Sequence, residues 1–86
     1  MPEKIMVARE TGEIGEAELL SFFDLEETGG KYIIYTFNET DANGLVKLHV
    51  GRVREENSTY IVSKIEDDNE WNQVKTAMKQ MITGGN

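Results

Sequence analysis

Short β-branched and aromatic runs alternate with glycine-rich or polar clusters along most of the chain. The clusters are ETGE at 10–13, ETGGK at 27–31, NETDANG at 38–44 and EENST at 55–59. Short runs between turn signals are typical of strands with tight connections, and Asn43-Gly44 tolerates the positive φ of a hairpin turn. The strands that this spacing predicts cover residues 4–9, 16–25, 31–37, 45–54 and 59–65. The pattern therefore predicts an antiparallel meander.

A helical pattern follows these strands. Asp67 and, three residues later, Glu70 have the form of a capping box, in which the Asp side chain accepts from the first turn's free backbone N–H groups and the Glu side chain reaches back to the cap residue. Apolar residues then recur at helical spacing. They are Trp71, Val74, Met78, Met81 and Ile82. We predict one α+β domain over residues 1–86, an antiparallel β-meander sheet of four to five strands with one C-terminal helix packed on one face.

The third predicted strand carries apolar side chains on both faces, and one helix can cover only one of them. The residues of interest are Tyr32, Ile34, Tyr35 and Phe37. We name these four as a candidate protein interface, for a partner or a second copy of the chain. The alternative is that the first strand and the loops cover the second face.

In the fourth predicted strand, Val46, Leu48 and Val50 alternate toward the sheet interior. Val53 then has the opposite parity, which predicts a bulge near Gly51.

With that bulge, four basic residues share the outer face of the strand. This basic row consists of Lys47, His49, Arg52 and Arg54. It is a candidate anion-binding site, and the alternative is cross-strand pairing with glutamates such as Glu16 and Glu18.

Composition narrows the function classes. Sixteen acidic against nine basic residues give a formal charge of -7, which disfavours nucleic acids and anionic membranes and favours a basic partner. There is no cysteine and one histidine, which leaves no disulfide and removes the usual metal ligands. No apolar stretch approaches membrane-spanning length and no signal peptide is recognisable, so we predict a cytoplasmic protein.

The sequence contains no convincing catalytic or cofactor motif. The acids at 66–68 are explained by the helix start. The loop at 38–44 resembles a calcium loop, but the position of its bidentate glutamate is Val50. Gly29-Gly30-Lys31 precedes a predicted strand, whereas a phosphate-binding loop precedes a helix. We therefore predict no enzyme activity, no metal and no cofactor.

Several local patterns together resemble a known family. They are the hairpin at 10–13, a strand that ends at Phe23, the GKY strand start at 30–32 and IEDDNEWNQV at 65–74. The chain resembles the YrzB-like family of small acidic bacterial proteins, a domain of unknown function. The resemblance implies a cytoplasmic antiparallel sheet with a terminal helix, and it brings no catalytic residues.

The sequence is compatible with three functions. The first is a non-enzymatic protein–protein interaction module or homodimer. The second is a small-molecule or anion-binding protein that uses the basic row. The third, which net charge alone suggests, is an acidic decoy of a nucleic-acid-binding protein. An exposed apolar patch without a pocket favours the first, and a concave site with converging polar groups favours the second.

Overall fold

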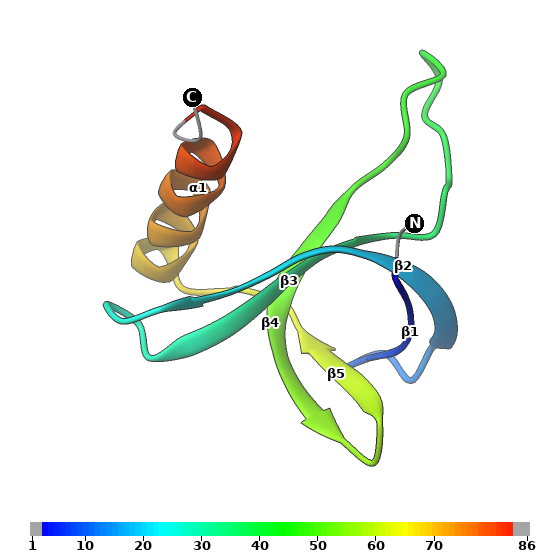
Figure 1. The fold of residues 1–86 in the computed structure, drawn as a ribbon, viewed down its shortest axis with the longest axis horizontal. Helices are drawn as coiled ribbons and strands as arrows, with labels where there is room; N and C mark the ends of the chain where they lie inside the picture. Colours follow the sequence, from blue (N-terminus) through cyan, green and yellow to red (C-terminus); the bar gives the residue numbers. More distant parts are fainter. Residues whose placement is uncertain (1–2, 84–86) are drawn as a thin grey trace.

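The computed structural model describes residues 3–83, in which five strands are followed by one helix (Figure 1). The elements are β1 (Glu3–Arg9), β2 (Ile14–Leu25), β3 (Gly30–Thr36), β4 (His49–Glu56), β5 (Thr59–Ser63) and α1 (Asp68–Thr83). The α+β class with one C-terminal helix is confirmed, and the strands lie close to their predicted positions except at the start of β4.

The sheet closes on itself. Consecutive strands pair antiparallel from β1 to β5, and β5 then pairs with β1 in parallel to form a closed barrel. The prediction of an open antiparallel meander sheet was wrong, because residues 6–9 pair with residues 59–62. In an up-and-down order all odd-numbered strands run the same way, so closing five strands brings two parallel ones together. Closure satisfies the edge backbone groups that an open sheet would expose.

Closure also explains the apolar residues on both faces of β3. Ile33 and Tyr35 point into the barrel and belong to its core. The other core residues are Ile5, Val7, Ala17, Val53 and Val62. Tyr32 has the opposite parity and lies on the outer face, yet it is fully buried, as is Val74 of α1. The protein therefore has one core inside the barrel and a smaller one between the barrel and the helix.

β4 begins at His49, four residues later than predicted. Val46 and Leu48 precede it with half or more of their surface exposed, so the prediction that they point inward was wrong. Gly51 and Val53 are buried at the inward positions of β4. The inward set is His49, Gly51 and Val53, opposite the inward residues Tyr35 and Ile33 of β3, so Val53 reaches the core without the predicted bulge.

The irregularity lies in β2 instead, where the register with β3 shifts between Leu19 and Ser21. Gly51 has a different role, because a Cβ at this position would overlap the side chain of Val62 on β5. A glycine here permits close approach of the two strands.

The helix begins where the sequence predicts. A carboxylate oxygen of Asp67 accepts a hydrogen bond from the Glu70 backbone N–H at 2.8 Å, and the Asp67 carbonyl accepts from the Trp71 N–H at 2.9 Å. The other half of the predicted capping box was wrong, because the Glu70 side chain turns toward the barrel. Val74 is buried and Trp71 half-buried against the sheet, whereas the side chain of Ile82 lies outside the described residues.

Candidate functional site

A pocket of about 440 Å³ lies at one end of the barrel. β1, β3 and β5 end at this side and β4 begins there, because the strands alternate in direction. We call it the barrel-end pocket. Its lining includes Arg9, Tyr35, Leu48, His49, Val62 and Lys64.

The pocket exists because β4 and β5 separate at this end. Their pairing runs only as far as Arg52 and Ser63, although β4 begins three residues earlier at His49. Arg9, the last residue of β1, pairs with Val62 of β5 and borders the same opening. Side chains from three strands therefore converge on one concavity.

Arg9 is held by an aromatic ring but makes no side-chain hydrogen bond with the described residues. Its guanidinium carbon lies 4.8 Å from the centre of the Phe37 ring. The nearest carboxylate oxygen, on Glu13, is 3.7 Å from Nη1, which is an ion pair without hydrogen-bond contact. The Arg9 Nε is buried and has no partner within residues 3–83. The side chain keeps unused donors, one of them desolvated at a cost to stability.

His49 forms the aromatic wall of the pocket. Its ring stacks on Tyr35 with centroids 5.3 Å apart and meets Phe37 edge-on at 5.8 Å. Its Nε2 lies 3.3 Å from a carboxylate oxygen of Glu39. These two aromatic contacts and the Glu39 contact hold the imidazole at the rim.

The charge of this pocket is opposite to that of the chain. Its lining holds two cations, Arg9 and Lys64, and one acid, Glu10, whereas the whole chain carries a formal charge of -7. The acids next to Arg9 and His49, Glu13 and Glu39, lie outside the lining with 71% and 54% of their side-chain surfaces exposed. Lys64 is exposed and has no ion-pair partner among residues 3–83. A concave site with basic groups from different strands attracts anions.

The predicted basic row is dispersed by the fold, because β4 has no bulge. Of its four members only His49 lines the barrel-end pocket, and Lys47 lies exposed before β4. Arg52 and Arg54 have the other parity on β4, and their acceptors are Glu70 at 3.1 Å and Glu56 at 2.7 Å. The glutamates that the sequence suggested as alternative partners are not the ones used.

Two pocket residues, Arg9 and Lys64, were not among the sequence candidates. Each is an isolated cation at the end of a predicted strand, and nothing local distinguishes it from a solvent-exposed charge. The signal is the parallel pairing of β1 with β5, which the sequence pattern does not show.

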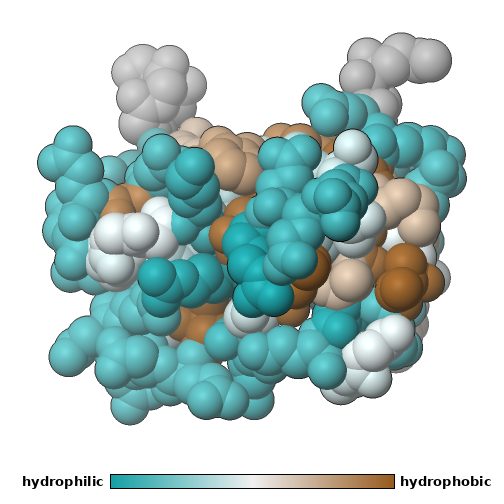
Figure 2. All heavy atoms as spheres, turned by 90° about the horizontal axis from the view of Figure 1, so that it is seen from below, coloured by the Kyte–Doolittle hydropathy of each residue, from teal (hydrophilic) through white to brown (hydrophobic). Residues whose placement is uncertain are grey.

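The candidate interface is divided between two environments. Tyr32 lies beneath α1 and Tyr35 inside the barrel, with 0% and 4% of their surfaces exposed, and Ile34 and Phe37 are half-buried. These residues do not form one exposed patch. On the face shown in Figure 2, hydrophobic residues occur as small separate patches among hydrophilic ones.

The most exposed apolar cluster lies on the connection between β3 and β4. Residues 37–48, which we call the arm, project from the barrel on the side away from α1 (Figure 1). Leu45, Val46 and Leu48 on this arm are 64%, 50% and 60% exposed. The Asp41 carboxylate accepts from the backbone N–H groups of Asn43 and Leu45 at 2.8 and 3.0 Å, which shapes the tip.

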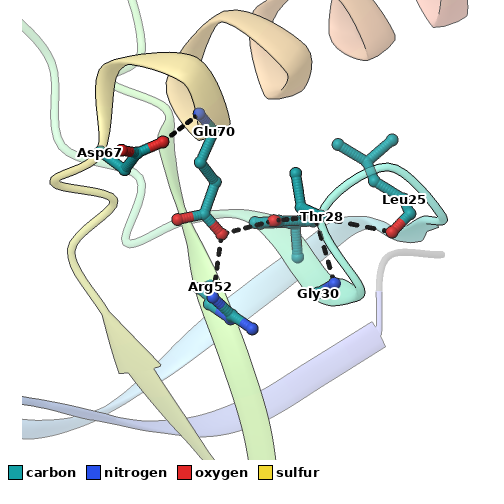
Figure 3. A network of polar contacts seen from close by, with 7 residues as sticks. Leu25, Thr28, Gly30, Arg52, Asp67 and Glu70 are labelled. Carbon is teal, nitrogen blue, oxygen red and sulfur yellow. Dashed lines mark hydrogen bonds and ion pairs between the residues drawn. The ribbon is translucent and has the colours of Figure 1, made fainter.

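A network of polar side chains, separate from the barrel-end pocket, connects α1 to the barrel (Figure 3). We call this network the helix clamp. The Tyr32 hydroxyl donates to Glu70 at 2.6 Å, and the same carboxylate oxygen accepts from Arg52 at 3.1 Å. The Thr28 hydroxyl lies 2.6 Å from the Tyr32 oxygen. Burial, followed by the hydrogen bond to Glu70, raises the pKa of Tyr32 above its ordinary value. The clamp is internally satisfied, which is typical of a structural network.

The described residues hold no group of three or more metal-ligating side chains that could bind an ion. Within residues 3–83 there is also no helix with the length and apolar character that crossing a membrane requires. The cytoplasmic location stays a prediction.

The chain belongs to a family described as a protein of unknown function (DUF1292), whose sequence model matches residues 10–83. The match extends from the turn after β1 to the end of α1 and so covers most of the chain. It agrees with the resemblance to a domain of unknown function, whereas the narrower YrzB-like identity and the bacterial source stay predictions. No curated protein and no solved structure matches the chain.

Proposed function

We propose that this chain is a non-enzymatic protein-interaction module that binds a basic partner protein through the arm. The observation that carries the proposal is the exposure of Leu45, Val46 and Leu48, three large hydrophobic side chains within four consecutive residues. Single exposed hydrophobic residues are ordinary, but a cluster on a projecting segment is typical of a contact surface.

The expected gain from covering this cluster is sufficient to anchor a partner. Removing each half-exposed side chain from water contributes about 1 to 2 kcal/mol at roughly 25 cal/mol per Å². Three adjacent side chains that enter one apolar groove therefore act as a hot spot, which the surrounding polar residues shield from water.

Charge favours a basic partner over a second copy of the chain. Two copies would each bring a formal charge of -7 to a shared interface, and the arm itself carries Glu39 and Asp41 against Lys47. Stable dimers bury about 800 Å² on each subunit, more than three side chains on an arm supply. A partner with an apolar groove and a basic rim complements the arm in both shape and sign.

The other functions have less support. No arrangement of the described residues indicates catalysis, since the polar groups of the clamp are engaged with one another. The acidic decoy rests on net charge alone, and no local feature favours it.

The test compares one triple variant with one single variant in protein capture. Leu45→Ser/Val46→Ser/Leu48→Ser removes the apolar cluster, and Ile14→Ser is the matched control because Ile14 is 68% exposed outside the arm. We expect a basic protein that wild type and the control capture from a lysate of the source organism, and that the arm variant loses. Its affinity, remeasured with purified components, should fall as salt rises.

Two results would contradict the proposal. One is equal capture by the arm variant and the control. The other is a dimer in sedimentation equilibrium that the arm variant abolishes, because the arm would then serve self-association.

A further inference from the structure

We infer that the barrel-end pocket binds a carboxylate group attached to an apolar body. This site shares Leu48 with the apolar cluster of the arm but not Leu45 or Val46, and the inference does not depend on the arm binding a protein. The volume of about 440 Å³ is that of a small-ligand site.

The pocket gathers positive charge in a chain that is otherwise acidic. Arg9 at the end of β1 and Lys64 just after β5 line it together with one acid, Glu10. The acids that contact Arg9 and His49, Glu13 and Glu39, are 71% and 54% exposed and do not line the pocket. With sixteen acidic and nine basic residues in the chain, such a grouping departs from the average surface. It produces a local field that attracts an anion.

Arg9 supplies the specific contact. The guanidinium carbon lies over the Phe37 ring, 4.8 Å from its centre, and the buried Nε has no hydrogen-bond partner within the described residues. The side chain of Glu13, its ion-pair partner within the described residues, is 71% exposed and remains at 3.7 Å. A carboxylate offers two coplanar oxygens that match the guanidinium fork, and a rotation of the arginine side chain would bring Nε into this pairing.

The rest of the lining selects the ligand. Leu48, Val50 and Val62 make apolar walls, and the rings of Tyr35 and His49 stack beside them. These surfaces suit an aliphatic or aromatic body. A singly charged carboxylate also meets less repulsion from the acidic chain than a phosphate dianion does.

The experiment follows backbone amide signals of the isotope-labelled protein during titration with 3-phenylpropionate. We expect saturable shifts at residues 9–11, 48–50 and 63–64, the segments that line the pocket. The uncharged 3-phenylpropionamide, which has the same body, should leave these signals unchanged. No saturable shift, or equal shifts with the acid and the amide, would overturn the inference.

Arg9→Gln should weaken 3-phenylpropionate binding by about tenfold or more, because a hydrogen-bonded charge pair contributes that much. Arg54→Gln is the matched control, since it removes the same charge from a position outside the pocket. Equal weakening by both would mean that only overall charge matters, and the inference would fail. Should Arg9→Gln not fold, exposed Lys64→Gln takes its place, with an expected loss of about threefold against none for Arg54→Gln.

One further ligand identifies the source of the carboxylate. A short peptide that ends in Val-Leu with a free C-terminus is compared with the small acid. Tighter binding of the peptide assigns the pocket to protein C-termini, and tighter binding of the acid assigns it to small organic acids. Leu45→Ser/Val46→Ser should retain binding of the carboxylate, which keeps this result independent of the arm's role.

Discussion

The helix clamp and the barrel-end pocket each contain an arginine, and the two arginines differ in whether their side chains make hydrogen bonds. In the clamp, Arg52 lies 3.1 Å from a Glu70 carboxylate oxygen that also accepts from Tyr32. In the pocket, Arg9 stacks on Phe37 and makes no side-chain hydrogen bond with the described residues.

The difference shows that one arginine contributes to the stability of the fold and that the other is available to bind a ligand. A buried polar network contributes to stability when every member has a partner, and it then has nothing left to offer a ligand. A desolvated donor without a partner costs stability and persists where function needs it. Removing groups from the clamp should therefore weaken the fold, whereas removing Arg9 should not.

The largest expected effect comes from Glu70→Ala. It leaves the buried Tyr32 hydroxyl without its acceptor and Arg52 without its partner, so the free energy of unfolding should fall by about 3 kcal/mol. Denaturant unfolding measures it. Glu56→Ala, which removes the acceptor of exposed Arg54, should cost no more than about 0.5 kcal/mol. Equal losses would mean that the clamp is no stronger than a surface ion pair.

Tyr32→Phe should cost about 1 to 1.5 kcal/mol, since it removes the hydroxyl but keeps the ring that stacks on Phe23 at 5.5 Å. The variant also has a pH signature. Burial and Glu70 raise the pKa of Tyr32, so the folded protein retains a proton that an unfolded tyrosine releases near pH 10.

Stability should accordingly be constant below pH of about 10 with respect to this group and decrease as the pH rises above it. The decrease should be smaller in Tyr32→Phe, with a remainder from Tyr60, whose pKa is raised by burial and by Glu55. Unfolding curves measured across alkaline pH give the comparison. Identical pH dependence in wild type and variant would exclude Tyr32 as a source.

Asp67→Ala should cost about 1 kcal/mol, because one N–H group of the first helical turn loses its acceptor. Asp68→Ala, which removes an exposed first-turn charge, should cost less than about 1 kcal/mol. Helix content by circular dichroism and denaturant unfolding distinguish the two. A larger loss from Asp68→Ala would require a partner for Asp68 that the structure does not contain among residues 3–83.

The smallest expected effect is that of Arg9→Met. The methionine keeps the packing of the arginine stem on Phe37 and removes the buried unsatisfied donor, so the change in unfolding free energy should remain within about 1 kcal/mol of zero. A loss as large as that of Glu70→Ala would show that Arg9 is a structural residue. The contrast between pocket and clamp would then disappear.

Local patterns in the sequence were sufficient to predict the strands and the helix, but they were insufficient to predict how these elements pair and pack. Asp67 predicted the helix start because capping depends on residues a single turn apart. Val46 and Leu48 gave a wrong strand boundary, because the alternation of apolar and polar residues extended the fourth predicted strand into the arm. The role of Glu70 was missed since its partners, Tyr32 and Arg52, lie far from it in the sequence.

The barrel-end pocket was also not predicted, because its residues come from segments that are distant in the sequence. His49 was recognised as a candidate, but its neighbours in the basic row were assigned by an expected bulge that β4 does not have. Arg9 and Lys64 meet only because the first and last strands pair, and periodicity within a strand contains no information on that contact.

The parallel β1–β5 pair has a consequence for how the chain folds as it is synthesised. Residues 6–9 emerge from the ribosome before their partners at 59–62, which follow only after β2, β3 and β4 have been synthesised. Contacts between such distant segments slow folding, because the intervening loop must close first. Until then β1 has an unpaired edge, so chaperone contact during synthesis should concentrate on this strand.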